Sequence, residues 1–165
     1  MKRKYLELGA PDVELMEAEL RTLSARAGAE AVVLLDLSGV VLAAHRVPDK
    51  IDVLLFAALL TSNFAATEEL SRRLGVTQFR VMYHEGKRQN LYFDKVAEDT
   101  ILVVLFKDSN ALGRVRLFTE KSVAELAKRI AMVTKPVSEM PDLPQAAAAS
   151  AYLRQIANAV LPGKI

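Results

Sequence analysis

The chain has 165 residues, of which 52% are hydrophobic, so it is long and apolar enough to fold around a buried core and is not a disordered chain. Its 22 basic and 20 acidic side chains give a net charge of +2, too small for a protein whose main partner is a polyanion such as nucleic acid. The absence of cysteine excludes disulfides, thiolate catalysis and cysteine-ligated metal sites, and it agrees with a reducing compartment.

Two stretches bear on localisation. The basic start, Met1–Lys4, is followed by Tyr5–Leu8, which contains Glu7, rather than by a long apolar core with a cleavage site, so we expect no signal peptide. The longest uncharged stretch, Val53–Thr67, is shorter than the roughly 20 apolar residues that a membrane-spanning helix needs. We therefore expect a cytoplasmic protein without membrane insertion.

The first predicted helix begins near Pro11 and ends at Gly28. Proline suits the first turn of a helix, and Asp12 and Glu14 favour its positive end. Glycine is the residue that most often stops a helix. Apolar residues recur at helical spacing between these limits: Met16, Leu20, Leu23 and Ala27.

A hairpin and a second helix follow. The apolar runs Ala31–Leu37 and Val40–Arg46 are joined by Ser38–Gly39, which is typical of a β-hairpin turn. The next apolar segment, from about Lys50 to Leu74, is too long for a strand. It predicts a helix of about six turns that stops at Gly75.

From Thr77 the hydrophobic period changes to two, which predicts strands. The expected elements are a strand over Phe79–His84, a turn at Glu85–Lys87, a return strand that contains Leu91 and Phe93, a turn at Ala97–Asp99, and a strand over Ile101–Phe106. The last of these is continuously apolar, which is typical of a central strand covered on both faces. The segment therefore predicts a meander of three strands.

The last helix of the predicted domain follows Ser109–Gly113. Its expected inward positions are Val115, Phe118, Val123, Leu126, Ile130 and Val133. The order of elements predicts an α+β domain: a five-stranded antiparallel sheet with helices on both faces. We place this domain in residues 1–135.

Residues 136–165 are predicted to form a carboxy-terminal linker and a short helix. Three prolines interrupt regular structure from Lys135 onward: Pro136, Pro141 and Pro144. Beyond them, apolar residues again lie at helical spacing: Tyr152, Leu153, Ile156, Ala157 and Val160. This stripe is a candidate contact either for a partner protein or for the chain's own domain.

The long helix has two unlike sides when successive residues are placed 100° apart. One side is predicted to face the core: Leu55, Phe56, Leu59, Leu60, Leu70 and Leu74. The other side carries small or apolar residues where a solvated helix would carry lysine and glutamate: Leu54, Ala57, Ala58, Thr61, Ala65 and Glu68, with Ser62, Glu69 and Arg72 at its margins. We interpret this side as a contact with another protein. A second layer within the chain and a mere run of helix-forming residues are the alternatives.

The first strand of the meander is predicted to lie at a sheet edge. Charged or polar side chains on an edge strand discourage its pairing with another strand, and this strand has only two of them, Arg80 and His84. Self-pairing about a two-fold axis would cover the edge and bring two copies of the long helix side by side. The dimer contact is therefore expected at Phe79, Val81 and Tyr83.

Little in the sequence supports an enzyme. The two histidines, His45 and His84, have no catalytic or metal-ligand pattern around them, and the seven glycines form no nucleotide-binding loop. We name no catalytic residue, and we expect no metal and no cofactor.

The order of elements and the Asp-x-x-Gly hairpin within Leu34–Ala43 resemble the roadblock/dynein light chain family. Four further stretches narrow the resemblance to the bacterial MglB proteins of that family: Gly9–Pro11, Asn63–Thr67, His84–Asp94 and Leu112–Leu117. The resemblance covers roughly Leu6 to Ile130, and the combination is more specific than any single stretch.

The resemblance implies a homodimer that binds MglA, a Ras-like small GTPase, and acts as its GTPase-activating protein in the control of cell polarity or gliding motility, with a cell pole as an expected location. In that family the first strand of the meander pairs with its twin, and the paired long helices meet the GTPase. The matching positions here are Ala58, Thr61, Ser62, Ala65 and Glu68.

The resemblance also implies that the chain donates no arginine finger to its partner. Arg72, Arg73, Arg114 and Arg116 are the candidates for such a finger, and we expect them to be ordinary helix-end or surface residues. The alternative function is a roadblock scaffold that binds a small GTPase or a polarity complex without accelerating hydrolysis.

Overall fold

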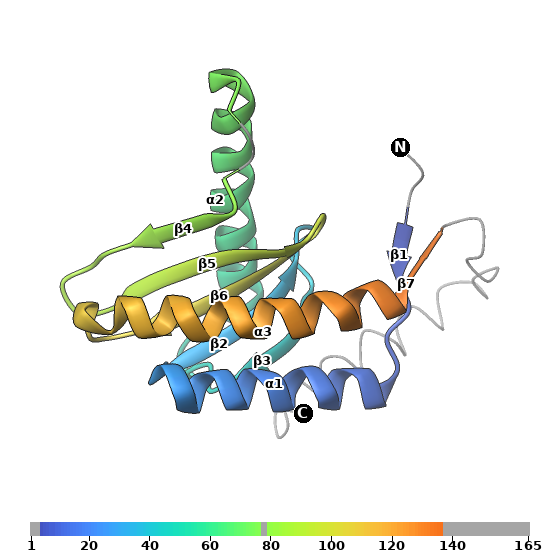
Figure 1. Ribbon diagram of the computed structural model, residues 1–165, viewed down its shortest axis with the longest axis horizontal. Helices are drawn as coiled ribbons and strands as arrows, with labels where there is room; N and C mark the ends of the chain where they lie inside the picture. The colour runs from blue at the N-terminus through green and yellow to red at the C-terminus, as the bar shows by residue number, and fades with distance from the viewer. Residues whose placement is uncertain (1–3, 77–78, 137–165) are drawn as a thin grey trace.

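The computed structural model describes residues 4–76 and 79–136. Five strands form one antiparallel sheet in the order β3-β2-β6-β5-β4, as Figure 1 shows. The strands are β2 (Ala31–Asp36), β3 (Val41–His45), β4 (Val81–His84), β5 (Asn90–Ala97) and β6 (Thr100–Phe106). The helices are α1 (Ala10–Ala27), α2 (Val53–Leu74) and α3 (Leu112–Val133), the last preceded by the short 3-10 helix η1 (Ser109–Ala111). The predicted sheet and its helices are confirmed.

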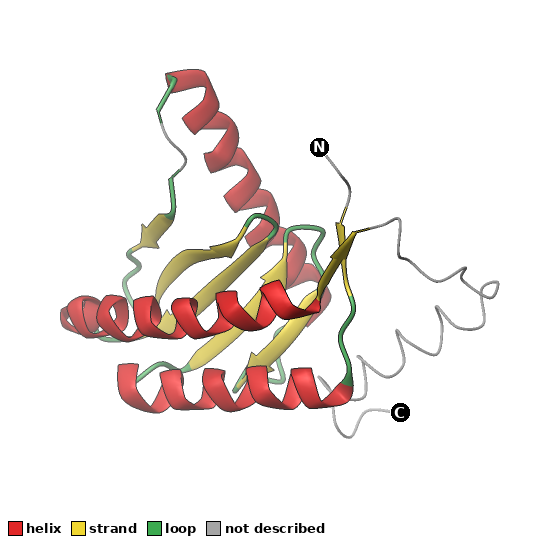
Figure 2. Ribbon diagram, turned by 45° about the vertical axis from the view of Figure 1, so that its right-hand side comes forward, coloured by secondary structure: helices red, strands yellow, loops and turns green. Residues whose placement is uncertain are grey.

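Helices cover both faces of this sheet. Helices α1 and α3 lie side by side on one face, where Leu20, Val104 and Leu126 belong to one core cluster (Figure 2). Helix α2 covers the other face, where Phe64 packs in a second cluster with Val103 of β6. The continuous apolar sequence of β6 follows from this arrangement, because alternate side chains enter the two cores.

The helix ends follow local chemistry. The Asp12 carboxylate accepts a hydrogen bond from the Gly9 N–H at 2.9 Å, which satisfies a free donor at the start of α1. Helix α2 begins at Val53, three residues later than the expected Lys50. The cause is Asp52, whose Oδ1 accepts from the N–H groups of Leu54 and Leu55 at 3.1 Å each.

A two-stranded ribbon joins the two ends of the described chain. Strand β1 (Lys4–Leu6) pairs antiparallel with β7 (Thr134–Pro136), and the Glu7 N–H donates to the Val133 carbonyl at 2.8 Å. The expectation that regular structure is interrupted from Lys135 onward is therefore wrong for residues 135–136. Proline is tolerated here because β7 lies at an edge, where one N–H needs no partner strand.

Strand β4 is shorter than expected. It begins at Val81, and Phe79 and Arg80 precede it. The predicted dimer residue Phe79 therefore lies beside the edge strand and not within it. The predicted contact residues Tyr152, Leu153, Ile156 and Val160 lie outside the described residues.

Candidate functional site

Helix α2 turns a narrow side toward the sheet. The side chains on it that are buried are Ala57, Leu60, Thr61, Phe64 and Ser71. The Thr61 hydroxyl donates to the Ala57 carbonyl at 3.0 Å, so its burial leaves no donor unsatisfied. Ala57 and Thr61 were expected on the side away from the sheet, and this expectation is wrong. Small residues at these positions let the helix approach the strands closely.

Glu68 also differs from its expected surroundings. It forms an ion pair with Lys95 of β5, and both side chains are largely buried. The Lys95 ammonium lies 5.8 Å from the centre of the Phe64 ring. Glu68 therefore joins α2 to the sheet instead of facing outward.

The remaining predicted residues occupy one accessible side of α2, which we call the small-residue side. Its members are Leu54, Ala58, Ser62, Ala65, Glu69 and Arg72. Leu54 is 78% exposed. At 100° per residue these six positions fall within a narrow arc, so they form one continuous strip along the helix.

A second exposed side of α2 is apolar, and we call it the leucine side. Its members are Leu55, Leu59, Ala66, Leu70 and Leu74. All four leucines are more than half exposed, so their expected place in the core is wrong. Leu55 and Leu59 lie on a different side of the helix from the buried residues Ala57, Leu60 and Phe64. Leu70 and Leu74 lie in the carboxy-terminal half of α2, which Figures 1 and 2 show extending beyond the sheet.

The outer edge of β4 has no partner strand in the described chain. The Lys95 N–H donates to the Arg80 carbonyl at 3.0 Å. Because hydrogen-bonded and non-hydrogen-bonded pairs alternate along an antiparallel ladder, the backbone groups of Val81 and Tyr83 point away from β5, toward the free edge. These are two of the three residues predicted for the dimer contact.

Exposed apolar side chains continue from α2 to this edge. Leu70 and Leu74 of α2 are followed along the chain by Val76, Phe79 and Val81, each at least 38% exposed. A monomeric protein rarely leaves so many large apolar side chains in water within one short segment. The protruding end of α2 and the β4 edge therefore form one surface suited to protein contact.

The four candidate arginine fingers all have partners within the chain. Arg72 and Arg73 both form ion pairs with Glu69, and Arg116 pairs with Glu120. Arg114 lies on the other face of the sheet, where its Nε donates to the Ala27 carbonyl at 3.1 Å and so caps the end of α1.

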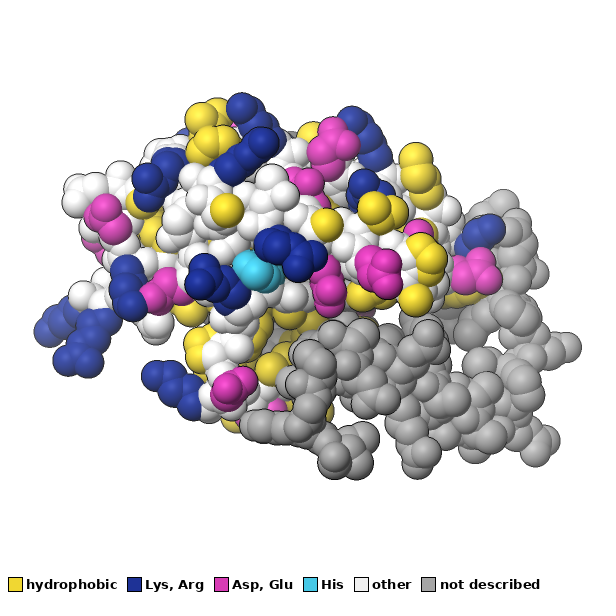
Figure 3. All heavy atoms as spheres, turned by 90° about the horizontal axis from the view of Figure 1, so that it is seen from below, with side chains coloured by type: hydrophobic (Ala, Val, Ile, Leu, Met, Phe, Trp, Pro, Cys, Tyr) yellow, Lys and Arg dark blue, Asp and Glu magenta, His cyan; other side chains and the backbone are white. Residues whose placement is uncertain are grey.

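The electrostatics of the described residues do not indicate a catalytic or metal centre. No group of three or more histidine, aspartate or glutamate side chains is placed to hold a metal ion within residues 4–76 and 79–136. Burial and the nearby arginines lower the pKa of His45, which favours its neutral form. Acidic and basic side chains are interspersed on the face shown in Figure 3, in agreement with the small net charge.

By length and composition alone, α2 is able to cross a membrane. Core helices of soluble proteins pass the same test, and one such helix is weak evidence. The Lys95–Glu68 ion pair and the burial of Phe64 attach this helix to the sheet. The helix thus packs against the sheet on one side, but only 22% of its most apolar stretch is buried.

The comparison with known families decides the classification. The Roadblock/LC7 domain model matches residues 16–106, which extend from α1 to the end of β6 and include α2 and β4. The chain belongs to the Roadblock/LC7 family. Among curated proteins, none matches this chain.

Several solved Roadblock/LC7 structures are similar to this chain. Myxococcus xanthus MglB is 31% identical with a TM-score of 0.69, over 72% of this chain and 96% of that one. The gliding protein MglB from Thermus thermophilus is 30% identical with a TM-score of 0.71, over 77% and 96%. An MglB in a tetrameric arrangement is 30% identical with a TM-score of 0.72, over 78% and 96%.

Sequence reasoning missed two features of this Roadblock/LC7 surface. The first is the leucine side, for which the repeated four-residue spacing of Leu55 with Leu59 and of Leu70 with Leu74 was a visible signal. The second is the pair formed by Arg80 and Asp94, in which the Arg80 Nε donates to Asp94 Oδ1 at 2.9 Å. No local pattern predicts this pair, because the two residues come from different segments.

Proposed function

We propose that this Roadblock/LC7 protein is an MglB-like homodimer that binds a Ras-like small GTPase of the MglA type and stimulates its GTP hydrolysis. The observation that carries the proposal is the small-residue side of α2. It is exposed along the helix, and short side chains such as Ala58, Ser62 and Ala65 allow a partner backbone to approach closely. The similarity to MglB structures supports a regulator of this kind.

The dimer is supported by the β4 edge. A two-fold axis beside Val81 and Tyr83 pairs their outward backbone groups with those of a second copy. The same operation brings the protruding half of α2 toward the partner, where Leu70 and Leu74 lose their contact with water. The small-residue sides of both helices then lie on one face of the dimer, as a composite surface for the GTPase.

The proposed activation requires no catalytic side chain from this chain. Phosphoryl transfer needs an aligned water and neutralisation of the developing charge, and both are supplied by residues of a GTPase held in its reactive conformation. A protein that binds this conformation more tightly than others accelerates the reaction by differential binding. Arg72 and Arg73 form surface ion pairs with Glu69, and the proposed mechanism requires neither arginine to reach the partner's nucleotide.

The test is single-turnover GTP hydrolysis by an MglA-type small GTPase from the same organism, with and without the protein. A parallel titration measures binding to the same GTPase loaded with GDP or with a non-hydrolysable GTP analogue. We expect faster hydrolysis and preferential binding to the analogue-bound state. Binding without faster hydrolysis would favour the scaffold function instead. The absence of binding would refute both functions and leave only the assignment of the fold.

A further inference from the structure

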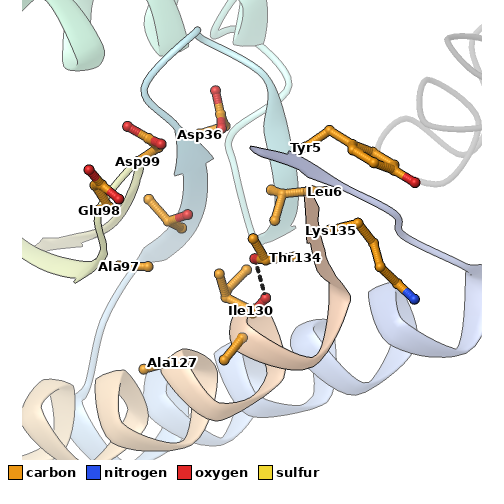
Figure 4. Close-up of a pocket in the computed structure, with 12 residues that line it drawn as sticks. Tyr5, Leu6, Asp36, Ala97, Glu98, Asp99, Ala127, Ile130, Thr134 and Lys135 are labelled. Carbon is orange, nitrogen blue, oxygen red and sulfur yellow. Dashed lines mark hydrogen bonds between the residues drawn. The ribbon is translucent and has the colours of Figure 1, made fainter. Parts of the chain in front are cut away.

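A groove lies at the carboxy-terminal end of α3, on the face of the sheet opposite α2. It is bounded by the β1–β7 ribbon, the end of α3 and the turn between β5 and β6, and it has a volume of about 450 Å³. Figure 4 shows its lining residues, which come from these three parts of the fold and from Asp36 at the end of β2. Nothing in the proposed GTPase contact uses this groove.

The floor of the groove is apolar. It is formed by Leu6 of β1, Ile130 of α3 and three alanines, Ala97, Ala127 and Ala131. Alanine at these three positions leaves open the space that longer side chains would fill. The floor can therefore receive apolar side chains from another segment.

One rim of the groove is acidic. Asp36, Glu98 and Asp99 lie on the side formed by β2 and the β5–β6 turn, opposite Lys135 (Figure 4). Burial raises the pKa of Asp99, and the neighbouring Glu98 and Asp36 carboxylates add to the effect. The charge of Lys95 acts on Asp99 and partly offsets these effects. Within residues 4–76 and 79–136, neither Asp36 nor Asp99 forms an ion pair with a basic side chain. Asp36 and Asp99 thus carry negative charge with which a further cation can pair.

The chain itself supplies a matching segment. Lys135 lines the groove, and one residue later β7 ends at Pro136, so the 29 residues 137–165 leave the domain at the groove's own rim. After Asp142 this tail contains no acidic residue and two basic ones, Arg154 and Lys164. The basic part also carries an apolar stripe at helical spacing: Tyr152, Leu153, Ile156 and Val160.

We propose that residues 152–164 dock in this groove of the same chain, with the apolar stripe on the alanine-lined floor and Arg154 beside the Asp36 and Asp99 carboxylates. The 15 residues between Pro136 and Tyr152 reach up to about 50 Å when extended, which is ample for this contact. A tether of this length holds the segment at an effective concentration on the order of millimolar. Weak contacts between the groove and the segment are sufficient under these conditions.

The test is disulfide cross-linking in the full chain, which has no native cysteine. The paired substitutions Ala131→Cys and Ile156→Cys join the floor to the stripe, and Leu117→Cys with Ile156→Cys is the matched control. Both α3 positions are exposed, but they lie 14 residues apart along the helix. We expect the groove pair to form its bond within one chain about tenfold faster than the control pair, because docking raises the local thiol concentration.

Two outcomes would overturn the proposal. Equal rates for the two pairs would mean that the tail does not prefer the groove. A bond that joins two chains would mean that the segment of one copy occupies the groove of another.

A second measurement tests the role of charge. Asp36→Asn combined with Asp99→Asn removes the negative rim. The first substitution keeps a side-chain oxygen for the Ser38 N–H, which now donates to Asp36 Oδ1 at 2.6 Å. We expect this change to slow cross-linking of the groove pair by about threefold or more at low salt. Glu17→Gln, on α1, is the control for charge removal elsewhere. An unchanged rate in the Asp36 and Asp99 variant would refute the pairing with Arg154.

Discussion

At the scale of single residues, the most costly group in the sheet is the carboxylate of Asp94. It is fully buried on β5, and one of its oxygens, Oδ2, has no hydrogen-bond partner among the described residues. Burial raises the pKa of Asp94, and the hydrogen bond and charge of Arg80 oppose that rise. Arg80 is 57% exposed and immediately precedes β4, so this pair also holds the start of the edge strand against β5.

Replacing Arg80 with alanine should destabilise the protein at neutral pH. The variant leaves a buried carboxylate without its cation, which we expect to lower the free energy of unfolding by about 1–3 kcal/mol. The loss should shrink as the pH falls. Because the pKa of Asp94 is raised in the folded state, the folded chain takes up this proton at a higher pH than the unfolded chain does. Protonation at low pH therefore favours folding. Urea unfolding at pH 7 and pH 4.5 measures both effects.

The matched control is Arg73→Ala, which removes an arginine from an exposed ion pair with Glu69. We expect a change within about 0.5 kcal/mol at either pH, because surface ion pairs contribute little. An equal loss in the two arginine variants, or a loss from Arg80→Ala that does not depend on pH, would contradict the role given to Asp94.

At the scale of elements, the sequence predicted those features that depend on neighbouring residues, such as the ends of helices. Gly28 and Gly75 end α1 and α2 in the left-handed conformation, with φ of 71° and 64°, as their sequence positions indicated. The β1–β7 ribbon was not predictable, because its pairing joins residues about 130 positions apart and neither short strand has a pattern of its own. Long-range pairing of this kind leaves no periodic signal in the sequence.

The orientation of α2 was predicted only in part, for a different physical reason. Assigning the leucine-rich side to the core assumes that the whole helix lies on the sheet. The protruding half breaks this assumption for Leu70 and Leu74. Elsewhere Phe64, with the small residues Ala57 and Thr61, occupies the side that faces the sheet and so fixes the rotation of the helix. Hydrophobicity alone does not distinguish a side buried within the chain from a side that another protein covers.

The small-residue side of α2 gives a direct test of GTPase binding. Ala65→Arg places a long charged side chain where a partner backbone is expected to approach, so we expect binding to weaken at least about 100-fold while the dimer persists. Ala124→Arg is the matched control, an exposed alanine on α3 across the sheet. Calorimetric titration of each variant with the GTPase measures the affinity. Unchanged binding by Ala65→Arg would show that the small-residue side is not part of the interface.

The free edge of β4 gives a direct test of the dimer. Val81→Pro removes an N–H that points away from β5, so the ladder within the chain stays intact while pairing with a second copy is blocked. We expect a monomer by light scattering at concentrations where the unaltered protein is a dimer. Val81→Thr keeps the N–H and should stay dimeric. A dimeric Val81→Pro protein would refute pairing through this edge.

At the scale of the whole molecule, the proposed dimer predicts that stability depends on association, because it would cover the exposed apolar side chains of α2 and β4. Only folded chains can form such a dimer. Each tenfold rise in protein concentration should therefore add about 1.4 kcal/mol per dimer to the free energy of unfolding. The melting temperature should therefore rise by about 2 °C per tenfold concentration, because the unfolding entropy of both chains opposes the shift. Scanning calorimetry over two decades of concentration measures this rise, and a constant melting temperature would indicate a monomer.

The β1–β7 ribbon also has a consequence for how the protein is made. Synthesis proceeds from the amino terminus, so Lys4–Leu6 leaves the ribosome long before Thr134–Pro136 is available to pair with it. Strand β1 thus stays without its partner strand until nearly the whole domain has been translated. Pairing of β1 with β7 is therefore one of the last steps in folding of the new chain. A chain truncated before residue 134 would carry all five strands of the main sheet and still leave its amino terminus unpaired.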